Sequence, residues 1–128
     1  MRAIAPVELM EFYIEALQQC GMYLLDMSDD DIEYYIFEEF DIGVGSFLHE
    51  NSLNRLKDAN LISEQVFQNS VKLRSSTMAL RNTAQWNIES VRRDDKWRDI
   101  LMLSDEIKSL LNVAKEARAM PQPIKAAQ

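Results

Sequence analysis

The chain has 128 residues, of which 47% are hydrophobic and 27% charged, and its formal net charge is −7. This length suits one domain with a single core, and the composition is that of a globular chain rather than a disordered or collagen-like one. The single cysteine excludes an internal disulfide framework and a multi-cysteine zinc site. Because no apolar run approaches membrane-helix length and acids interrupt the first dozen residues, we expect a cytoplasmic protein without membrane contact.

Negative charge is concentrated in the first third of the chain. Residues 1–41 contain eleven Asp or Glu and one Arg, whereas residues 42–128 contain ten acids and thirteen bases. A field of this sign repels nucleic-acid phosphates and raises the encounter rate with a basic partner. We therefore expect a basic protein partner and no nucleic-acid binding through this region.

Two helices are predicted before the middle of the chain. Pro6 suits a first helical turn, and apolar residues then recur every three or four positions to about Leu25, at Val7, Met10, Ile14, Leu17, Gly21 and Leu24. Ser28 is a strong helix start, because its hydroxyl can cap free amides while the aspartates after it complement the helix dipole. We expect the second helix to cover residues 29–40.

Two glycines follow this helix in the sequence. In the sequence IGVGS, Gly43 and Gly45 can take backbone conformations that other residues avoid, and we expect them to break the helix. Ser46 is then expected to cap a third helix that ends near Asn60.

The second half of the chain predicts further helices. Ser63 begins one that reaches at least Arg81, and the weak stretch 82–85 then interrupts the pattern. A short piece follows, with apolar residues Trp86, Ile88 and Val91. The last helix should run from about 95 to 119, where two prolines end it, and we expect residues 121–128 to form a mobile tail.

No segment alternates between apolar and polar residues with period two, and no internal repeat is visible. The sequence therefore predicts an all-α fold, with a single-domain bundle of about five to six helices over residues 1–120. The short connections favour antiparallel neighbours.

No stretch of the chain carries a catalytic motif. His49 is the only histidine, so a two-histidine metal site is impossible, and it shares a helical side with leucines, which favours a structural role. Cys20 has no acid–base partner beside it in sequence and is interpreted as a small core residue. We therefore expect no enzymatic activity and no cofactor.

The aspartates near residue 30 match a calcium loop only in part. Asp26, Ser28 and Asp30 alternate as calcium ligands do. Asp31, however, stands where such a loop needs glycine, and Phe37 stands where it needs a bidentate glutamate. The sequence therefore predicts no metal site.

A basic cluster near the two tryptophans has two interpretations. Its members are Arg92, Arg93, Lys96 and Arg98. Such a cluster could bind nucleic acid, but the acids Asp94, Asp95 and Asp99 lie among these bases and neutralise their field. An ion-paired helix entry is the favoured interpretation.

The predicted second helix presents carboxylates and a phenol on one face. Helical spacing places its apolar residues on one side, at Ile32, Tyr35, Ile36 and Phe40. We expect the polar remainder of this stretch to contact a partner through Asp30, Asp31, Glu33, Tyr34, Glu38 and Asp41. The alternative is a face that is merely solvated.

Two stretches carry a resemblance to a known class of protein. They are EEFDIGVGSFLHENSLNRLKDANLISEQV (residues 38–66) and DDKWRDILMLSDEIKSLL (residues 94–111), about half the chain. They resemble small helical immunity proteins encoded beside toxins in bacterial contact-dependent growth inhibition and related polymorphic toxin systems. The resemblance implies binding of one cognate toxin domain, often a nuclease, in the cytoplasm, with its active site or substrate surface blocked.

These observations predict a non-enzymatic protein that neutralises a basic toxin through its acidic helix face. The alternative is a structural or regulatory helical adaptor, in which apolar residues of the last helix mediate self-association and the acids confer solubility. The oligomeric state cannot be derived from the sequence.

Overall fold

The computed structural model describes the backbone of residues 4–119 and the side chains of residues 4–112. Its first half contains α1 (Pro6–Gln18), the 3₁₀ helix η1 (Met22–Asp26), α2 (Asp29–Ile32), the π-helix η2 (Glu33–Phe40) and α3 (Asp41–Ser46). Its second half contains α4 (Glu50–Asp58), α5 (Glu64–Met78), α6 (Ile88–Arg93) and α7 (Asp95–Ala119). The predicted tail, 121–128, lies outside the described residues.

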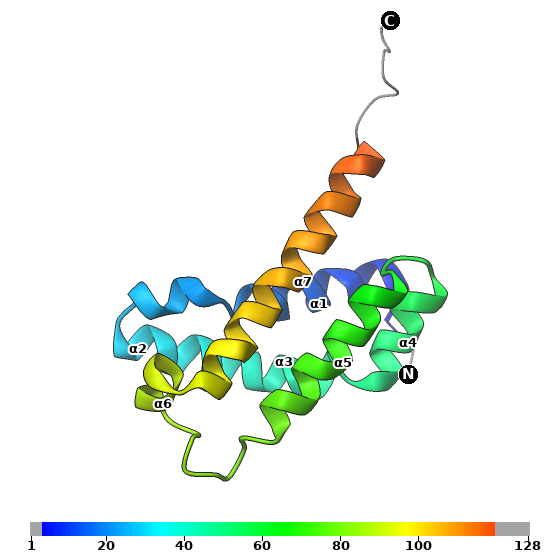
Figure 1. The fold of residues 1–128 in the computed structure, drawn as a ribbon. Helices are drawn as coiled ribbons and strands as arrows, with labels where there is room; N and C mark the ends of the chain where they lie inside the picture. Colours follow the sequence, from blue (N-terminus) through cyan, green and yellow to red (C-terminus); the bar gives the residue numbers. More distant parts are fainter. Residues whose placement is uncertain (1–3, 120–128) are drawn as a thin grey trace, which may run out of the picture.

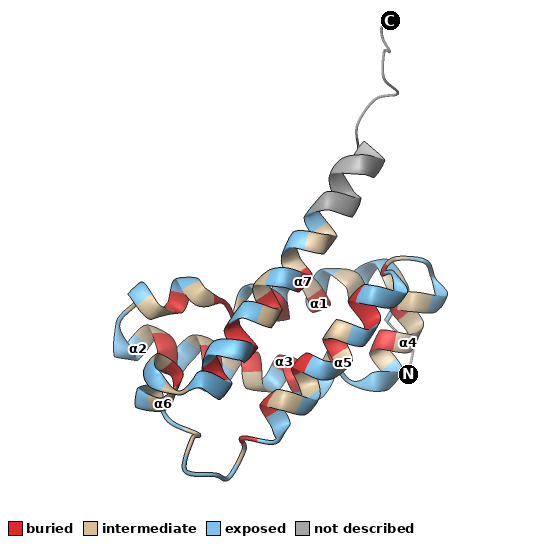
Figure 2. Cartoon of the chain, in the orientation of Figure 1, coloured by how far each residue is buried: buried red, intermediate tan, exposed pale blue. Residues whose placement is uncertain are grey.

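The helices pack around one hydrophobic core. Helix α7 crosses in front of α1 and beside α5, and its last turns project away from the other helices (Figure 1). Buried residues line the inward faces of all the longer helices, as Figure 2 shows. The described residues contain no strand, and α2, η2 and α3 follow one another without interruption. With that segment counted as one helix, residues 4–119 form six helices and one 3₁₀ turn, which confirms the predicted all-α bundle.

Helix α1 is shorter than its apolar spacing predicted. It ends at Gln18 rather than near Leu25, and the chain continues as η1. Its last carbonyls contact α7, whose Ser104 hydroxyl donates to the carbonyls of Leu17 and Cys20 at 3.2 and 2.9 Å. The Leu17 carbonyl also accepts from the Cys20 amide at 3.1 Å, and the chain becomes extended at Gly21.

The turn after α1 lies directly against α7. The Met22 amide donates to an Asp105 carboxylate oxygen at 3.0 Å, and Lys108 donates to the Cys20 carbonyl at 2.7 Å. A Cβ on Gly21 would lie 2.6 Å from that carboxylate, so only glycine allows the chain this close. The apolar face of α1 differs from the predicted one, because Val7, which was predicted to lie on it, is 66% exposed.

The expected break at the two glycines is wrong, because the helix continues from Asp29 through Ser46. Its buried residues are spaced by four, at Ile32, Ile36, Phe40 and Val44. In a regular α-helix, residues four apart drift by about 40° around the axis at each step. The wider π turns of η2 oppose that drift, so the four residues stay on one face.

Gly43 packs against a residue that is remote in sequence. It is buried, and a Cβ built on it would lie 2.7 Å from the Cβ of Ala16 in α1. A Cβ on Gly45 would meet nothing within 4 Å. Gly43 therefore serves the close approach of α1 and α3, and neither glycine serves a turn.

Of the three serines predicted to cap helices, two do so and one does not. Ser28 and Ser63 cap their helices as predicted, and each hydroxyl accepts from the amide three residues ahead. Ser46 does not cap the third helix, because it still belongs to α3. His49 takes this role, as its Nδ1 accepts from the Asn51 amide at 3.1 Å. No described helix is long and apolar enough to cross a membrane.

The contact between α1 and α3 gives a first testable prediction. Gly43→Ala should lower the free energy of unfolding by about 1 kcal/mol, because overpacking costs about 1–3 kcal/mol and helix propensity returns about 1 kcal/mol. Gly45→Ala is the matched control and should raise it by about 1 kcal/mol, because it gains the same helix propensity without a clash. Urea denaturation followed by tryptophan fluorescence measures both, and equal effects would contradict the proposed contact.

Candidate protein-binding surface

Most of the predicted contact residues are open to solvent. Asp30, Glu33, Tyr34 and Glu38 are exposed, and Asp31 is half-buried. Among the described side chains, none of these four carboxylates lies within 4 Å of a basic group. Within the described side chains, these carboxylates therefore remain available for contact with an external partner.

Asp41, the sixth predicted residue, is engaged inside the protein. Arg81 reaches its carboxylate with Nη2 at 2.6 Å and Nε at 2.8 Å, and also donates to its backbone carbonyl at 3.1 Å. Such a two-nitrogen arrangement fixes geometry as well as charge. The structure thus separates Asp41 from the open carboxylates.

A second arginine holds the other end of the same helix. Arg92 of α6 contacts the Asp29 carboxylate at 2.8 Å and donates to the carbonyls of Leu25 and Met27. Together with Arg81, it ties both ends of the helix spanning residues 29–46 to the second half of the chain. Arg92 and Arg93 are ion-paired, but their partners are Asp29 and, at 3.5 Å, Glu89 rather than the acids that lie among these bases in the sequence. Lys96 and Arg98 form no ion pair among the described side chains.

Three tyrosines from two helices form a cluster beside the open carboxylates. The ring centroids of Tyr34 and Tyr35 lie 5.4 Å apart, and those of Tyr35 and Tyr23 lie 6.5 Å apart, both edge-on. Tyr23 also donates its hydroxyl to the carbonyl of Gln18 at 2.6 Å. With 48% of Tyr34 and 42% of Tyr23 exposed, the tyrosine cluster offers rigid aromatic surface at little cost in conformational entropy.

The π-helix decides which carboxylate lies beside Tyr34. Glu39, five residues ahead, raises the pKa of Tyr34 above its ordinary value, and burial and Glu38 add to the shift. A negative carboxylate disfavours the phenolate, so Tyr34 keeps its donor proton. The α-helical spacing used for the sequence placed Tyr34 on one face with Glu38 but not with Glu39. Residues five apart become neighbours only in a π-helix.

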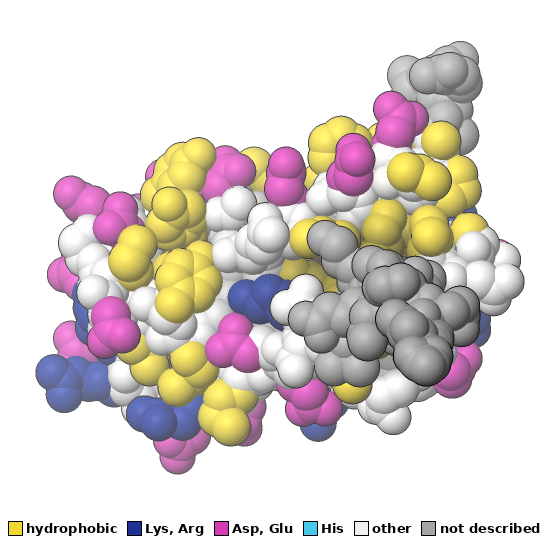
Figure 3. Space-filling model, turned by 90° about the horizontal axis from the view of Figure 1, so that it is seen from above, with side chains coloured by type: hydrophobic (Ala, Val, Ile, Leu, Met, Phe, Trp, Pro, Cys, Tyr) yellow, Lys and Arg dark blue, Asp and Glu magenta, His cyan; other side chains and the backbone are white. Residues whose placement is uncertain are grey.

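The tyrosine cluster lies in a patch of apolar and acidic side chains. On the left of Figure 3, over η1, hydrophobic side chains gather with acidic ones around them. Burial raises the pKa of Tyr23 to about 12, and Cys20, Tyr35 and Asp105 add to this effect. These phenols are therefore neutral at physiological pH, and the single hydroxyl proton of Tyr23 is already donated to the Gln18 carbonyl.

The candidate catalytic residues have structural positions. Cys20 is fully buried in the core, and burial raises its pKa to about 12 although the Lys108 ammonium opposes the shift. His49 is exposed and caps α4. The prediction that Cys20 is a core residue is confirmed. Among the described residues, no group of three His, Cys, Asp or Glu side chains is placed to hold a metal ion.

The environment of Cys20 gives a second prediction. In the folded protein at pH 8, iodoacetamide should modify Cys20 very slowly, because the thiol is buried and almost wholly protonated. In 8 M urea, where its pKa returns to an ordinary value, modification should be complete within minutes. Intact-mass measurement over time distinguishes the two, and rapid labelling of the folded protein would contradict this placement.

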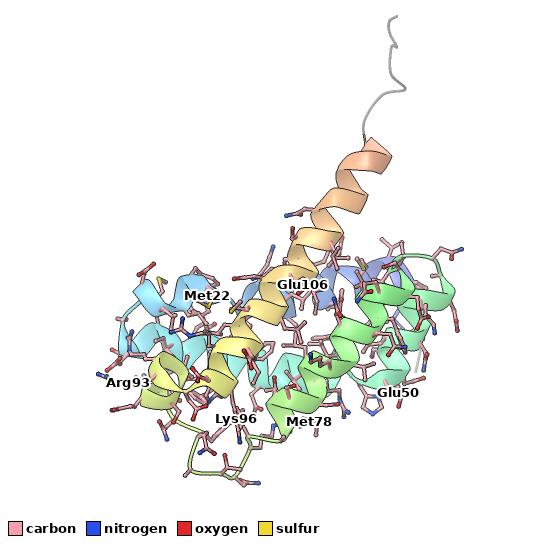
Figure 4. All side chains as sticks on the ribbon, in the orientation of Figure 1. Met22, Glu50, Met78, Arg93, Lys96 and Glu106 are labelled. Carbon is pink, nitrogen blue, oxygen red and sulfur yellow. The ribbon has the colours of Figure 1, made fainter. Side chains whose placement is uncertain are left out.

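A groove with a volume of about 940 Å³ lies between α5 and α7. Leu80, Ile100 and Leu103 contribute apolar surface, and Lys96 and Glu106 stand among its charged residues. Figure 4 labels these two on α7 and Met78 at the end of α5. The groove lies on α5 and α7, and none of the residues predicted to bind a partner lines it.

The chain matches no protein-family model, no curated protein and no solved structure. The chemistry of the surface must therefore be read from its own geometry. Carboxylates held along one helix can accept hydrogen bonds from Lys and Arg, and exposed tyrosine rings can pack against their stems and planes. This combination suits a basic protein surface.

Proposed function

We propose that the protein is a non-enzymatic immunity protein that binds and neutralises a basic, nuclease-type toxin domain in the bacterial cytoplasm. The observation that carries this proposal is the row of open carboxylates around Tyr34, none paired with a base among the described side chains. They are Asp30, Asp31, Glu33, Glu38 and Glu39. The resemblance of residues 38–66 and 94–111 to immunity proteins supports it.

Inhibition would follow from charge and shape together. A nuclease recognises nucleic acid largely through bases that contact phosphates. Carboxylates held on a rigid helix compete for the same bases, and their field accelerates association. The exposed ring of Tyr34 adds an anchor of the kind that dominates binding energy in protein interfaces.

Charge reversal tests the proposed surface. The double variant Glu33→Lys, Glu38→Lys should weaken binding of the toxin domain by at least tenfold, because two attractive contacts become repulsive. The matched control Glu50→Lys, Asp58→Lys makes the same change in net charge at exposed positions of α4 and should bind within twofold of wild type.

If the gene beside this chain's gene encodes a large secreted protein, the C-terminal domain of that protein is the partner for this measurement. Calorimetry at several salt concentrations gives affinity and its salt dependence, which should be steep for wild type and shallower for the surface variant. Equal weakening by both double variants would show that net charge alone matters and would contradict the surface. A neighbouring gene whose product does not bind would contradict the function.

A second candidate function is a helical adaptor that acts through self-association. The groove between α5 and α7 favours it, since Met102 on the groove is 52% exposed and the end of α7 projects from the bundle (Figure 1). Exposed apolar surface of this kind is typical of interaction sites.

Light scattering during size-exclusion chromatography tests the adaptor. If it is correct, wild type should form a stable homo-oligomer, and Met102→Asp should convert it to a monomer by placing a charge on the apolar contact. Glu50→Lys serves as a control outside the groove. A monomeric wild type at high concentration would contradict self-association.

A further inference from the structure

A shallow hollow lies between α1 and α3, next to the acidic helix face. Its volume is about 80 Å³, and its apolar lining includes Phe12, Ile42 and Phe47. The rings of Phe12 and Phe47 stack, with centroids 5.1 Å apart and planes 17° apart. Ile42 is 62% exposed, so the hollow has a large apolar side chain at its edge that nothing in the described protein covers.

The floor of the hollow is made by a close contact between α1 and α3. Ala16 and Gly43 both line it, and there is no room for a Cβ on the glycine. The packing of these two small residues therefore fixes the floor, while side chains such as Phe12 and Phe47 form the walls.

Acidic side chains surround the hollow, and the basic side chains near it form bonds within the protein. Glu15 and Glu39 line it, and helical spacing places Glu8 and Glu11 on the same exposed side of α1. None of these four forms an ion pair among the described side chains. Arg55 donates to the Ile4 carbonyl just before α1, and Arg81 pairs with Asp41, the neighbour of Ile42 in sequence.

The size of the hollow selects the kind of ligand. Small-molecule pockets begin at about 300 Å³, so 80 Å³ is too small for a metabolite or cofactor. It suits the tip of one aliphatic side chain. Because every charge at the rim is negative, residues flanking that side chain must be basic to match it.

We propose that the hollow between α1 and α3 binds a basic amphipathic helix of a protein partner, which inserts one aliphatic side chain between Phe12, Ile42 and Phe47. The lysines or arginines of that helix contact the acidic rim. An apolar side chain in a hollow with bases around it is the usual form of helix-in-groove recognition.

The inference rests on the proposed function, since it adds an apolar anchor for the same basic partner. Glu39 belongs to both surfaces, because it lines the hollow and lies beside Tyr34. The two surfaces still differ in chemistry: the helix face binds through charge, and the hollow binds through apolar contact. Separate variants can therefore test them separately.

The probe is a fluorescein-labelled 18-residue peptide of leucine and lysine, with leucines spaced three and four apart so that they form one helical face. A peptide of the same composition with its leucines spread around the helix is the first control. A leucine–glutamate peptide with the original spacing is the second. Fluorescence anisotropy measures binding of each to the full-length protein.

Wild type should bind the leucine–lysine probe at least tenfold more tightly than either control peptide. Ile42→Asp should weaken probe binding at least tenfold, although it adds a negative charge that by itself would attract lysines. Met78→Asp, the same change at an exposed apolar residue at the end of α5, should leave binding within twofold. Glu39→Lys should weaken it and serves as a second variant if Ile42→Asp lowers the melting temperature.

Four outcomes would overturn the inference: no probe binding by wild type, equal binding of the control peptides, unchanged binding by Ile42→Asp and Glu39→Lys, or a homodimer that Ile42→Asp dissociates. The last would show that a second copy covers the hollow. If Ile42→Asp loses the probe while Glu33→Lys, Glu38→Lys retains the toxin, the hollow stands and the acidic helix face fails. If Ile42→Asp retains the probe while Glu33→Lys, Glu38→Lys loses the toxin, the acidic helix face stands and the hollow fails.

Discussion

The contact between the end of α1 and the side of α7 is the interaction on which the rest of the structure depends. Ser104 and Lys108 both donate to the Cys20 carbonyl just after α1, and Asp105 accepts from the first amide of η1. These bonds hold the turn at Gly21 against α7, and the chain that follows this turn brings Tyr23 beside Tyr35. The position of the tyrosine cluster therefore depends on the contact with α7.

The charges of the protein have two separate uses. Basic side chains mostly hold the fold together, as Arg81 and Arg92 do when they tie the two ends of the helix spanning 29–46 to α6 and the turn after α5. The carboxylates between those ends have no such task within the described residues. A protein that used its acids only for solubility would not need them on the helix that is most firmly held at both ends.

The sequence predicted what depends on local chemistry. Ser28 and Ser63 start helices because a hydroxyl beside free amides acts within one turn, and the helical spacing of apolar residues identified the all-α fold. It misjudged what depends on distant neighbours. Gly43 resembles a helix breaker until Ala16 is placed against it, and Glu39 becomes a neighbour of Tyr34 only when a buried spacing of four imposes π turns. The sequence therefore predicted four exposed residues of the acidic face, but it did not predict which side chains surround them.

The backbone contact between Ala16 and Gly43 also bears on the entropy of binding. A side chain that enters the hollow meets a floor whose atoms have no rotamers to lose, since alanine and glycine carry none. At the floor itself, ordering therefore falls on the incoming segment, whereas the side chains of Phe12, Ile42 and Phe47 around it are ordered by any partner that fits. Differences in affinity among partners should therefore reflect how well each partner is preorganised, while this side of the interface stays constant.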